Sequence, residues 1–318
     1  MPVRHFPVNM EMRTSNNDAD MACSVLIRTF NSAGTLGAVL ERLGGTGIDE
    51  ILVVDSGSTD ETLRIAEKFG ARIIRVEGAF HYSRSLNIGF EAAGNPWVLV
   101  ISSHCIPVSD KLIPRIRESI SRMSSETVVI YGRCMLFADN LDATGFNEYD
   151  LDDWRSRKVR GGNGFAVYRK SAWQEKAFDE TIPTAEDMEW LRWHLRMGRK
   201  AGVEQGLVAM YRNKGSLRYM FRKGWIEFIM GFALMEKTPR VSRVLRYPLG
   251  PVIMSAKMVQ CLMRRRIDLR SAIRSVAHSC GAAAAGCLVE SGLIKVPGMN
   301  DDTKGGGKGI VQGERKGS

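Results

Sequence analysis

The feature that most constrains the fold is a regular alternation of two sequence patterns between residues 24 and 131. Residues 24–28 form a short apolar run typical of a buried strand, and residues 36–43 then place apolar side chains at helical spacing. Strands that alternate with helices predict a largely parallel sheet with helices on both faces. Ligands of such sheets bind beyond the carboxyl ends of the strands. We therefore expect an α/β protein with a Rossmann-like domain whose chemistry lies at that edge.

Four further strands and three further helices continue the alternation. Ser58 and Glu61 fit a capping box, with Ser58 as the N-cap of a helix that continues through Phe69. We expect strands at 50–54, 72–76, 97–102 and 127–131, and helices at 58–69, 83–93 and 112–120.

The 318-residue chain exceeds the most common domain size, which favours one large domain with an appendage. The alternation ends near residue 217, and segments of helical pattern rich in Arg and Lys follow. The first stretch of the chain is polar, and the last is rich in Gly and Lys. We expect a disordered leader at 1–21, an α/β domain at 22–216, a basic helical region at 217–296 and a disordered tail at 297–318.

The formal net charge is +10, and many of the lysines and arginines follow Arg155. The sequence has no aromatic RNA-binding signature, zinc-finger spacing or helix-turn-helix pattern, which argues against nucleic acid as a partner. Anionic lipid head groups and a substrate that carries a diphosphate fit the charge better. The alternative is a set of solvated helix faces for the basic residues of the C-terminal region, which include Arg218, Arg222, Lys223 and the arginines at 264–266.

The six cysteines form no close CxxC pair, and the N-terminal residues lack the apolar segment of a secretory signal. Both observations favour reduced thiols and a cytoplasmic protein. Charged or polar residues interrupt the apolar stretches of the C-terminal region, so none is expected to span a membrane. These residues are Glu227, Lys257, His278 and Glu290.

The loops after the first two strands carry candidate binding residues. The loop at 29–34 lacks the glycine pattern of a dinucleotide fold and of a phosphate loop, which disfavours NAD and ATP. Asn31 in this loop has a helix cap as its alternative role. Asp55 follows the second strand, where a carboxylate accepts hydrogen bonds from a base or a ribose. The alternative for Asp55 is an aspartate that closes its own loop.

Several segments occur in an order that resembles family-2 glycosyltransferases of the GT-A fold, of the bacterial polysaccharide-biosynthesis type. The resemblance covers about residues 22 to 213, and the order and spacing of the segments carry it more than any one of them. The segments are SVLIRTFN, EILVVDSGSTDET, FHYSRSLNIGFEAAGNPWVLVISSHCIP, GNGFAVYRKSAW and FDETIPTAEDMEWLRWHLRMGRKAGV.

The resemblance implies a nucleotide-sugar donor at the carboxyl edge of the sheet. Thr29 and Asp55 would hold its nucleobase and ribose, and Arg84 would contact the base or the phosphates as a bidentate donor. A solvated arginine on a helix face is the alternative for Arg84. The full set of donor residues that the resemblance implies is Thr29, Asn31, Asp55, Ser56, Arg84, Ser102, Ser103 and His104.

The resemblance also implies an inverting reaction, in which a carboxylate deprotonates the acceptor hydroxyl while the nucleotide diphosphate leaves from the opposite face of the sugar. Asp187 is expected to be this base, with Glu186 supporting the acceptor or its loop. The alternative is that both carboxylates only stabilise the start of the helix that follows.

Two departures from the family pattern concern the diphosphate. Ser102, Ser103 and His104 stand where most members carry an Asp-x-Asp motif that binds Mg²⁺ or Mn²⁺. The hard oxygen ligands are replaced, and one neutral imidazole, His104, makes a doubtful metal site. Arg212 stands where many relatives have a histidine, and it is expected to stabilise the leaving diphosphate together with Lys214. We therefore expect transfer that is independent of metal, with Mn²⁺ or Mg²⁺ as the alternative.

The expected function is sugar transfer to a glycan or a lipid-linked acceptor during the synthesis of a surface or extracellular polysaccharide. The protein is then expected in the cytoplasm, at the inner face of the membrane, with peripheral contact to anionic lipid. The alternative function is a non-catalytic protein that binds nucleotide-sugars or serves as a scaffold for polysaccharide assembly. A nucleotidyltransferase would need a Gly-rich N-terminal signature, which the sequence lacks.

Overall fold

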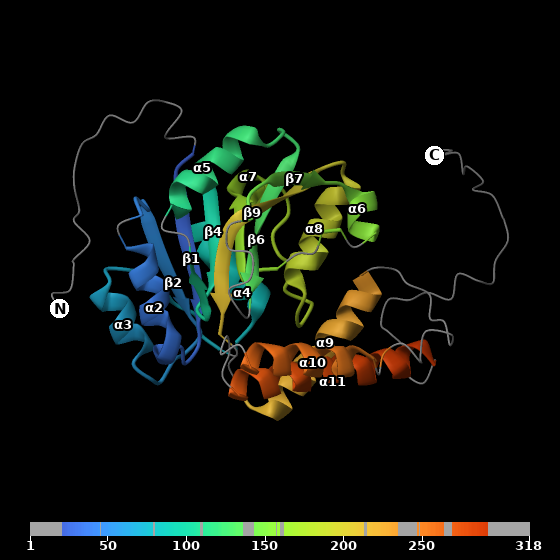
Figure 1. Cartoon of the computed structure of the whole chain (residues 1–318). Helices are drawn as coiled ribbons and strands as arrows, with labels where there is room; N and C mark the ends of the chain where they lie inside the picture. The colour runs from blue at the N-terminus through green and yellow to red at the C-terminus, as the bar shows by residue number, and fades with distance from the viewer. Residues whose placement is uncertain are drawn as a thin grey trace, which may run out of the picture.

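The structure is a computed structural model of the whole chain (Figure 1). It describes residues 21–44, 46–78, 80–108, 111–135, 143–156, 158–159, 162–212, 215–234, 247, 249–263 and 269–291. The predicted tail, all but the last residue of the predicted leader, Lys214 and the arginines at 264–266 lie outside these residues.

One nine-stranded sheet forms the centre of the protein, in the order β3-β2-β1-β4-β8-β6-β9-β5, with β7 paired to β9 (Figure 1). The strands are β1 (Cys23–Thr29), β2 (Glu50–Asp55), β3 (Arg72–Arg75), β4 (Trp97–Ser102), β5 (Cys105–Pro107), β6 (Thr127–Met135), β7 (Phe146–Tyr149), β8 (Phe165–Arg169) and β9 (Lys200–Tyr211).

The two halves of the sheet differ in strand direction. β3, β2, β1 and β4 are all parallel, as the alternation of strands and helices predicted. β8 then pairs antiparallel with both β4 and β6, while β6 and β9 are parallel to each other. The N-terminal half is thus Rossmann-like, and β8 joins it to a mixed half in one continuous sheet.

Helices cover both faces of the sheet, as expected for strands that are buried on both sides. Side chains of α2, α3 and α5 pack in one hydrophobic cluster, and those of α4, α6, α7 and α8 pack in the other. The helices are α2 (Ala33–Leu43), α3 (Thr62–Lys68), α4 (Tyr82–Ala92), α5 (Leu112–Arg122), α6 (Leu151–Arg155), α7 (Lys170–Glu175) and α8 (Glu186–Arg196).

The predicted capping box at Ser58 is wrong. Helix α3 begins at Thr62, and its N-cap is Glu61, which makes no side-chain capping bond. Ser58 Oγ instead donates a hydrogen bond to Asp55 at 2.5 Å. A serine that satisfies a carboxylate in its own loop is not available to the first turn of a helix, so the helix starts later than the sequence pattern indicated.

Three further helices form a layer beyond the carboxyl ends of the parallel strands, seen below the sheet in Figure 1. They are α9 (Leu217–Leu234), α10 (Leu249–Met263) and α11 (Leu269–Glu290). Gly224 of α9 and Gly281 of α11 lie at the helix crossing, where an added Cβ would clash with the backbone oxygen of the opposite helix. His278 Nε2 and Glu227 Oε2 add a polar contact between the same two helices at 2.9 Å.

By length and composition, the window Ala272–Val289 of α11 is apolar enough to cross a membrane, and 33% of the window is buried within the protein. From the sequence, His278 was expected to exclude this segment as a membrane span. The helix nevertheless remains long and apolar enough to cross a membrane. The same helix packs against both α9 and α10.

Candidate active site

The carboxyl ends of three neighbouring parallel strands meet at one edge of the sheet. Thr29 at the end of β1 lies beside Asp55 at the end of β2, and Arg28 lies beside Ser102 at the end of β4. Because β8 runs antiparallel to β4, the segment that precedes β8, including Asn163, comes to the same edge. This edge therefore collects residues from four strands that lie far apart in the sequence.

Asp55 is 1% exposed, and both oxygens of its carboxylate accept hydrogen bonds from neighbouring residues. Oδ1 accepts from Thr29 Oγ1 at 2.7 Å and from Ser58 Oγ at 2.5 Å. Oδ2 accepts from the backbone N–H groups of Gly57 at 3.1 Å and Ser58 at 2.8 Å. This is the loop-closing geometry, so a nucleobase that contacts Asp55 directly has to displace one of these donors. The donor roles of Thr29 and Asp55 stay predictions.

Asn31 links the loop after β1 to the loop after β2. Its side-chain oxygen accepts a hydrogen bond from the Thr59 backbone at 2.9 Å, and its own backbone N–H donates to Ser58 Oγ at 2.8 Å. Its φ of 47° lies in the left-handed region, which asparagine tolerates better than most residues. Nearby, the buried Ser56 has its Oγ 3.2 Å from Ser85 Oγ. Asn31 and Ser56, both predicted to bind the nucleotide-sugar, thus make contacts that stabilise these loops.

The segment Ser102-Ser103-His104 continues from the end of β4. Ser103 is 5% exposed, and its Oγ lies 2.8 Å from Ser32 Oγ in the loop after β1. Ser102 Oγ donates to the Asn163 backbone oxygen at 3.2 Å. The two hydroxyl groups therefore tie β4 to its neighbours on either side.

Arg212 and His104 are brought together by the pairing of β5 with β9. The Arg212 backbone N–H donates to the His104 carbonyl oxygen at 2.8 Å. The His104 ring meets the Tyr211 ring edge-on, with 4.9 Å between ring centroids. The Arg212 side chain is exposed directly after β9. Its predicted partner in diphosphate binding, Lys214, lies outside the described residues.

Arg84 lies in the first turn of α4 with its side chain exposed. Its backbone N–H is 3.4 Å from His81 Nδ1, which caps this helix. An exposed guanidinium fits both of the roles considered for it, a contact with an anion and a solvated helix face.

Glu186 and Asp187 open α8 after an unusual backbone turn. Ala185 has a φ of 64°, in the left-handed region, where a conformation that is costly for alanine is found mainly at functional sites. Glu186 is 4% exposed. Its Oε1 pairs with Arg28 Nη1 at 3.2 Å and accepts from Asn163 Nδ2 at 3.1 Å. Glu186 is therefore a buried carboxylate that is paired with a cation.

The Asp187 carboxylate adjoins this pair. Its Oδ2 accepts a hydrogen bond from the Asn163 backbone and its Oδ1 one from the Met188 backbone, both at 2.8 Å. Burial and the neighbouring Glu186 charge together raise the pKa of Asp187 from 3.8 to about 7, with the two backbone donors and Arg28 acting in the opposite direction. A carboxylate with a pKa near neutrality is suited to accept a proton during catalysis.

Asn163 is the residue that joins the donor edge to the acidic pair, and the sequence interpretation gave it no role. It is 5% exposed, and its oxygen Oδ1 accepts from Tyr168 Oη at 2.5 Å. Its backbone and side-chain N–H groups hold Asp187 and Glu186, and its carbonyl oxygen accepts from Ser102. Its position in the quoted GNGFAVYRK segment was the available signal.

Arg28 is a second residue that the sequence interpretation left without a role. Its guanidinium contacts the Tyr82 backbone oxygen at 3.4 Å and lies 5.3 Å from the centre of the Tyr82 ring. The Arg28 side chain is 9% exposed, and Glu186 is its acidic partner. The end of β1 thus supplies the cation that allows Glu186 to be buried.

The sheet and its flanking helices have the fold of GT-A glycosyltransferases. The family model of glycosyl transferase family 2 matches residues 24–174, just under half of the chain, and this part is similar to that family. The matched region ends before the acidic pair, which the structure attaches to it through Asn163.

Solved structures support the same fold. Glucosyl-3-phosphoglycerate synthase from Mycobacterium tuberculosis, in complex with phosphoglyceric acid, superimposes with a TM-score of 0.53 at 15% identity. The match covers 71% of this chain and 84% of that one. S. aureus TarS has a TM-score of 0.50 at 16% identity, and the match covers 85% of this chain and 55% of that one.

A curated relative is similar over a much shorter stretch. A TPR repeat-containing protein of Synechococcus elongatus is 36% identical over 56 residues, which is 18% of this chain. The chain matches 14% of that relative's length. This short match carries no argument about the activity of the whole protein.

The segment at the end of β4 fits a divalent metal poorly. Mg²⁺ and Mn²⁺ prefer carboxylate and other hard oxygen ligands. The Ser103 hydroxyl already pairs with Ser32, and the Ser102 hydroxyl donates to a backbone oxygen. Within the described part of the chain, no three His, Cys, Asp or Glu side chains converge on one point. By contrast, the mycobacterial synthase has been solved in complex with Mn²⁺ and uridine diphosphate.

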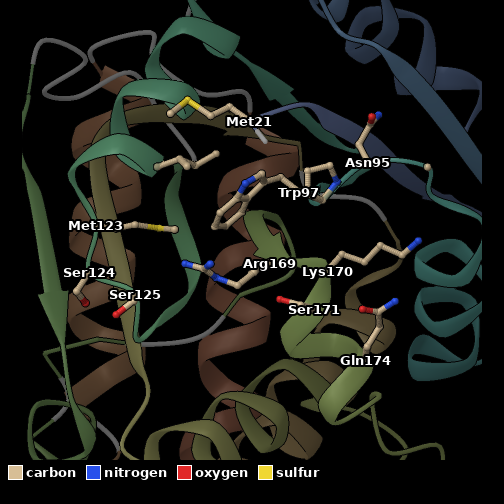
Figure 2. A pocket seen from close by; sticks show the side chains of 13 residues that line it. Met21, Asn95, Trp97, Met123, Ser124, Ser125, Arg169, Lys170, Ser171 and Gln174 are labelled. Atoms are coloured by element: carbon tan, nitrogen blue, oxygen red, sulfur yellow. The ribbon is translucent and has the colours of Figure 1, made fainter. Parts of the chain in front are cut away.

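A pocket of about 690 Å³ lies at the opposite edge of the sheet (Figure 2). It is lined by residues at the start of β4 and the end of β8, among them Trp97, Arg169 and Lys170. Arg169 lies 4.9 Å from the Trp97 ring and donates to the Thr127 backbone oxygen, and Lys170 donates to the Ala93 backbone oxygen. Both cations are engaged in contacts within the fold. Because Trp97 lies at the start of β4 and the candidate active site lies at its end, the pocket is separate from that site.

Proposed function

We propose that this chain transfers a sugar from a nucleotide-sugar donor to an acceptor hydroxyl with inversion at the anomeric carbon. The observation that carries the proposal is the contact of Asn163 with Ser102 on one side and with both acidic residues on the other. A donor bound at the carboxyl edge of the sheet would then lie beside a carboxylate whose pKa is raised to about 7.

In this mechanism Asp187 accepts the proton of the acceptor hydroxyl as its oxygen attacks the anomeric carbon. The bond from that carbon to the diphosphate oxygen breaks, and the nucleotide diphosphate leaves with the bonding electrons. Glu186, held by Arg28, keeps the environment of Asp187 anionic and so maintains its basicity. Arg212 stabilises the charge that develops on the leaving group.

The proposal includes transfer without a divalent metal, because hydroxyl groups and one imidazole replace the carboxylates and Arg212 supplies positive charge. Sugar transfer is expected to persist in EDTA, with less than about a tenfold loss of rate, since electrostatic stabilisation by the arginine remains. Loss of activity in EDTA with recovery in Mn²⁺ alone would contradict metal independence and leave sugar transfer itself intact.

The proposed setting is the synthesis of a surface or extracellular polysaccharide, with a glycan or lipid-linked acceptor, at the cytoplasmic face of the membrane. The support is the basic region at 217–296 and the resemblance to enzymes of that type. Uridine diphosphate sugars are the first donors to test, because the mycobacterial synthase of the same fold was solved with uridine diphosphate.

The decisive experiment compares donor binding with turnover. UDP-, GDP- and dTDP-sugars are screened by thermal shift, because a bound ligand raises the unfolding temperature. The double variant Glu186→Gln/Asp187→Asn is expected to keep the ligand-induced shift and to lose transfer. If both the wild type and the double variant bind a donor and neither releases nucleotide diphosphate with any acceptor, the non-catalytic alternative holds.

A further inference from the structure

Helix α10 exposes a largely apolar face, on which Gln260 is the exposed polar residue among those described. The exposed positions recur at intervals of three and four residues, which places them on one face of the helix. The exposed side-chain fractions are 56% for Leu249, 64% for Val252, 55% for Ile253, 58% for Val259 and 81% for Met263. Scattered exposed apolar residues are normal on a protein surface, whereas a contiguous apolar face is typical of an interaction site.

The opposite face of α10 packs within the protein. Met258 is 3% exposed, and α10 lies against α11. Lys257 is the single charged residue among the 15 residues of the helix. An ordinary surface helix would carry charged residues on its outer face, so the outer face of α10 is unusual for a helix in water.

The region that contains α10 also holds the entire net charge of the chain. Residues 217–296 contain 14 lysines and arginines against four acidic residues, which equals the formal +10 of the whole sequence. The helices next to α10 in the chain expose Arg218, Arg222 and Arg270 within their first two turns. Lys223 is engaged within the protein, with its Nζ 3.5 Å from Glu227 Oε1.

We infer that the exposed face of α10 docks onto the surface of a bilayer that contains anionic lipids. The face enters the boundary between head groups and acyl chains, and the surrounding arginines pair with the lipid phosphates. A second copy of this chain is a poorer occupant, because it would bring another strongly cationic surface to the same contact.

This docking specifies the membrane partner of the proposed function, because a lipid-linked acceptor would be held on the same surface as the enzyme. The role of docking in bringing the enzyme to its acceptor rests on the proposed function. Vesicle binding is measured without donor or acceptor, however, so a failure of docking and a failure of transfer are distinguishable.

The test is co-sedimentation of the full chain with vesicles of phosphatidylcholine alone or mixed with phosphatidylglycerol. The wild type is expected to bind the mixed vesicles and to bind less at high salt. The triple variant Val252→Ser/Ile253→Ser/Val259→Ser is expected to bind roughly tenfold more weakly, since it loses apolar surface that enters the bilayer. Met197→Ser is the control for loss of an exposed apolar side chain elsewhere, because Met197 is 61% exposed at the C-terminal end of α8. It is expected to bind like the wild type.

A second measurement does not depend on a variant that folds. Amide hydrogen exchange of the wild type is expected to slow in α10 when mixed vesicles are added. Absence of binding to mixed vesicles, or equal binding by the triple variant and the wild type, overturns the inference. A lower molecular mass of the triple variant in solution would identify a second copy as the occupant. Retention in cell membranes after alkaline carbonate would identify a spanning helix instead of interfacial docking.

Discussion

In the proposed mechanism, the environment of Asp187 sets the pH dependence of transfer. Burial and the neighbouring Glu186 raise its pKa to about 7, and the base has to be ionised to accept a proton. About one tenth of the enzyme is then ionised at pH 6 and about nine tenths at pH 8, which follows from a pKa of about 7. The value of kcat/KM, which reports ionisation of the free enzyme, is therefore expected to rise about tenfold over this interval.

Two charge variants move this midpoint in opposite directions. Glu186→Gln removes the negative charge that raises the pKa of Asp187, so the pH profile is expected to shift to lower pH. Arg28→Gln removes a positive charge that opposes the rise, so its profile is expected to shift to higher pH. Both substitutions keep the approximate shape of the side chain.

The assay is the initial rate of nucleotide diphosphate release between pH 5 and 9, with ¹³C NMR of the labelled Asp187 carboxyl as a readout that does not need turnover. Lys68→Gln, an exposed change at the end of α3, serves as the control for a single lost charge. A wild-type rate that is flat from pH 6 to 8, or a Glu186→Gln profile shifted to higher pH, would refute the role assigned to the pair.

Three more predictions concern the leaving group, a buried histidine and the helical layer. Arg212→Ala is expected to lower kcat by about a hundredfold, since removal of one donor to a developing negative charge has an effect of this size. Arg212→Lys should recover part of the loss in the same steady-state assay, whereas equal kcat in all three proteins would exclude the arginine from the reaction. Burial and the charges of Arg199 and Lys176 lower the pKa of His194 from 6.5 to about 4. The folded state therefore binds this proton more weakly than the unfolded chain, and the free energy of unfolding should fall by at most about 1.4 kcal/mol per pH unit as the pH drops from 6.5 towards 4. Urea titrations should show a smaller fall for His194→Gln, and parallel curves would contradict the assignment. Gly281→Ala is expected to destabilise the contact between α9 and α11 by about 1–3 kcal/mol, because the new methyl group meets the Phe221 backbone. Thermal unfolding measures this against Gly34→Ala, where a Cβ has open space around it.

The sequence was sufficient to predict the parallel half of the sheet, because each strand and helix there leaves its own periodic pattern. The strands at 97–102 and 50–54 were predicted within a residue of β4 and β2. The place of β8 between β4 and β6 was not predictable in this way. It depends on pairing between segments far apart in the chain, and strand order leaves no local periodic signal.

The candidate site shows the same division. Asp187 and Glu186 were predicted as site residues from their position before a helix in a family-like segment, and that role stays a prediction. Their connection to the donor edge was not found, because it depends on Asn163 contacting residues 102 and 187 at once. The predicted capping box at Ser58 was wrong because the Ser58 hydroxyl donates its hydrogen bond to the Asp55 carboxylate in the same loop. Local patterns do not reveal which of two partners a side chain will choose.

The position of β8 has a consequence for how substrates enter and leave. It is hydrogen-bonded to β4 on one side and to β6 on the other, so the proposed nucleotide edge and the segment that holds the proposed base belong to one continuous sheet. Two parts of one hydrogen-bonded sheet are not expected to close on each other by a hinge motion, as separate domains do. Any gating of the reaction has to come from the loops that rim the sheet and from the helices beneath them, and evolution can alter substrate choice there without disturbing the distance between donor and base.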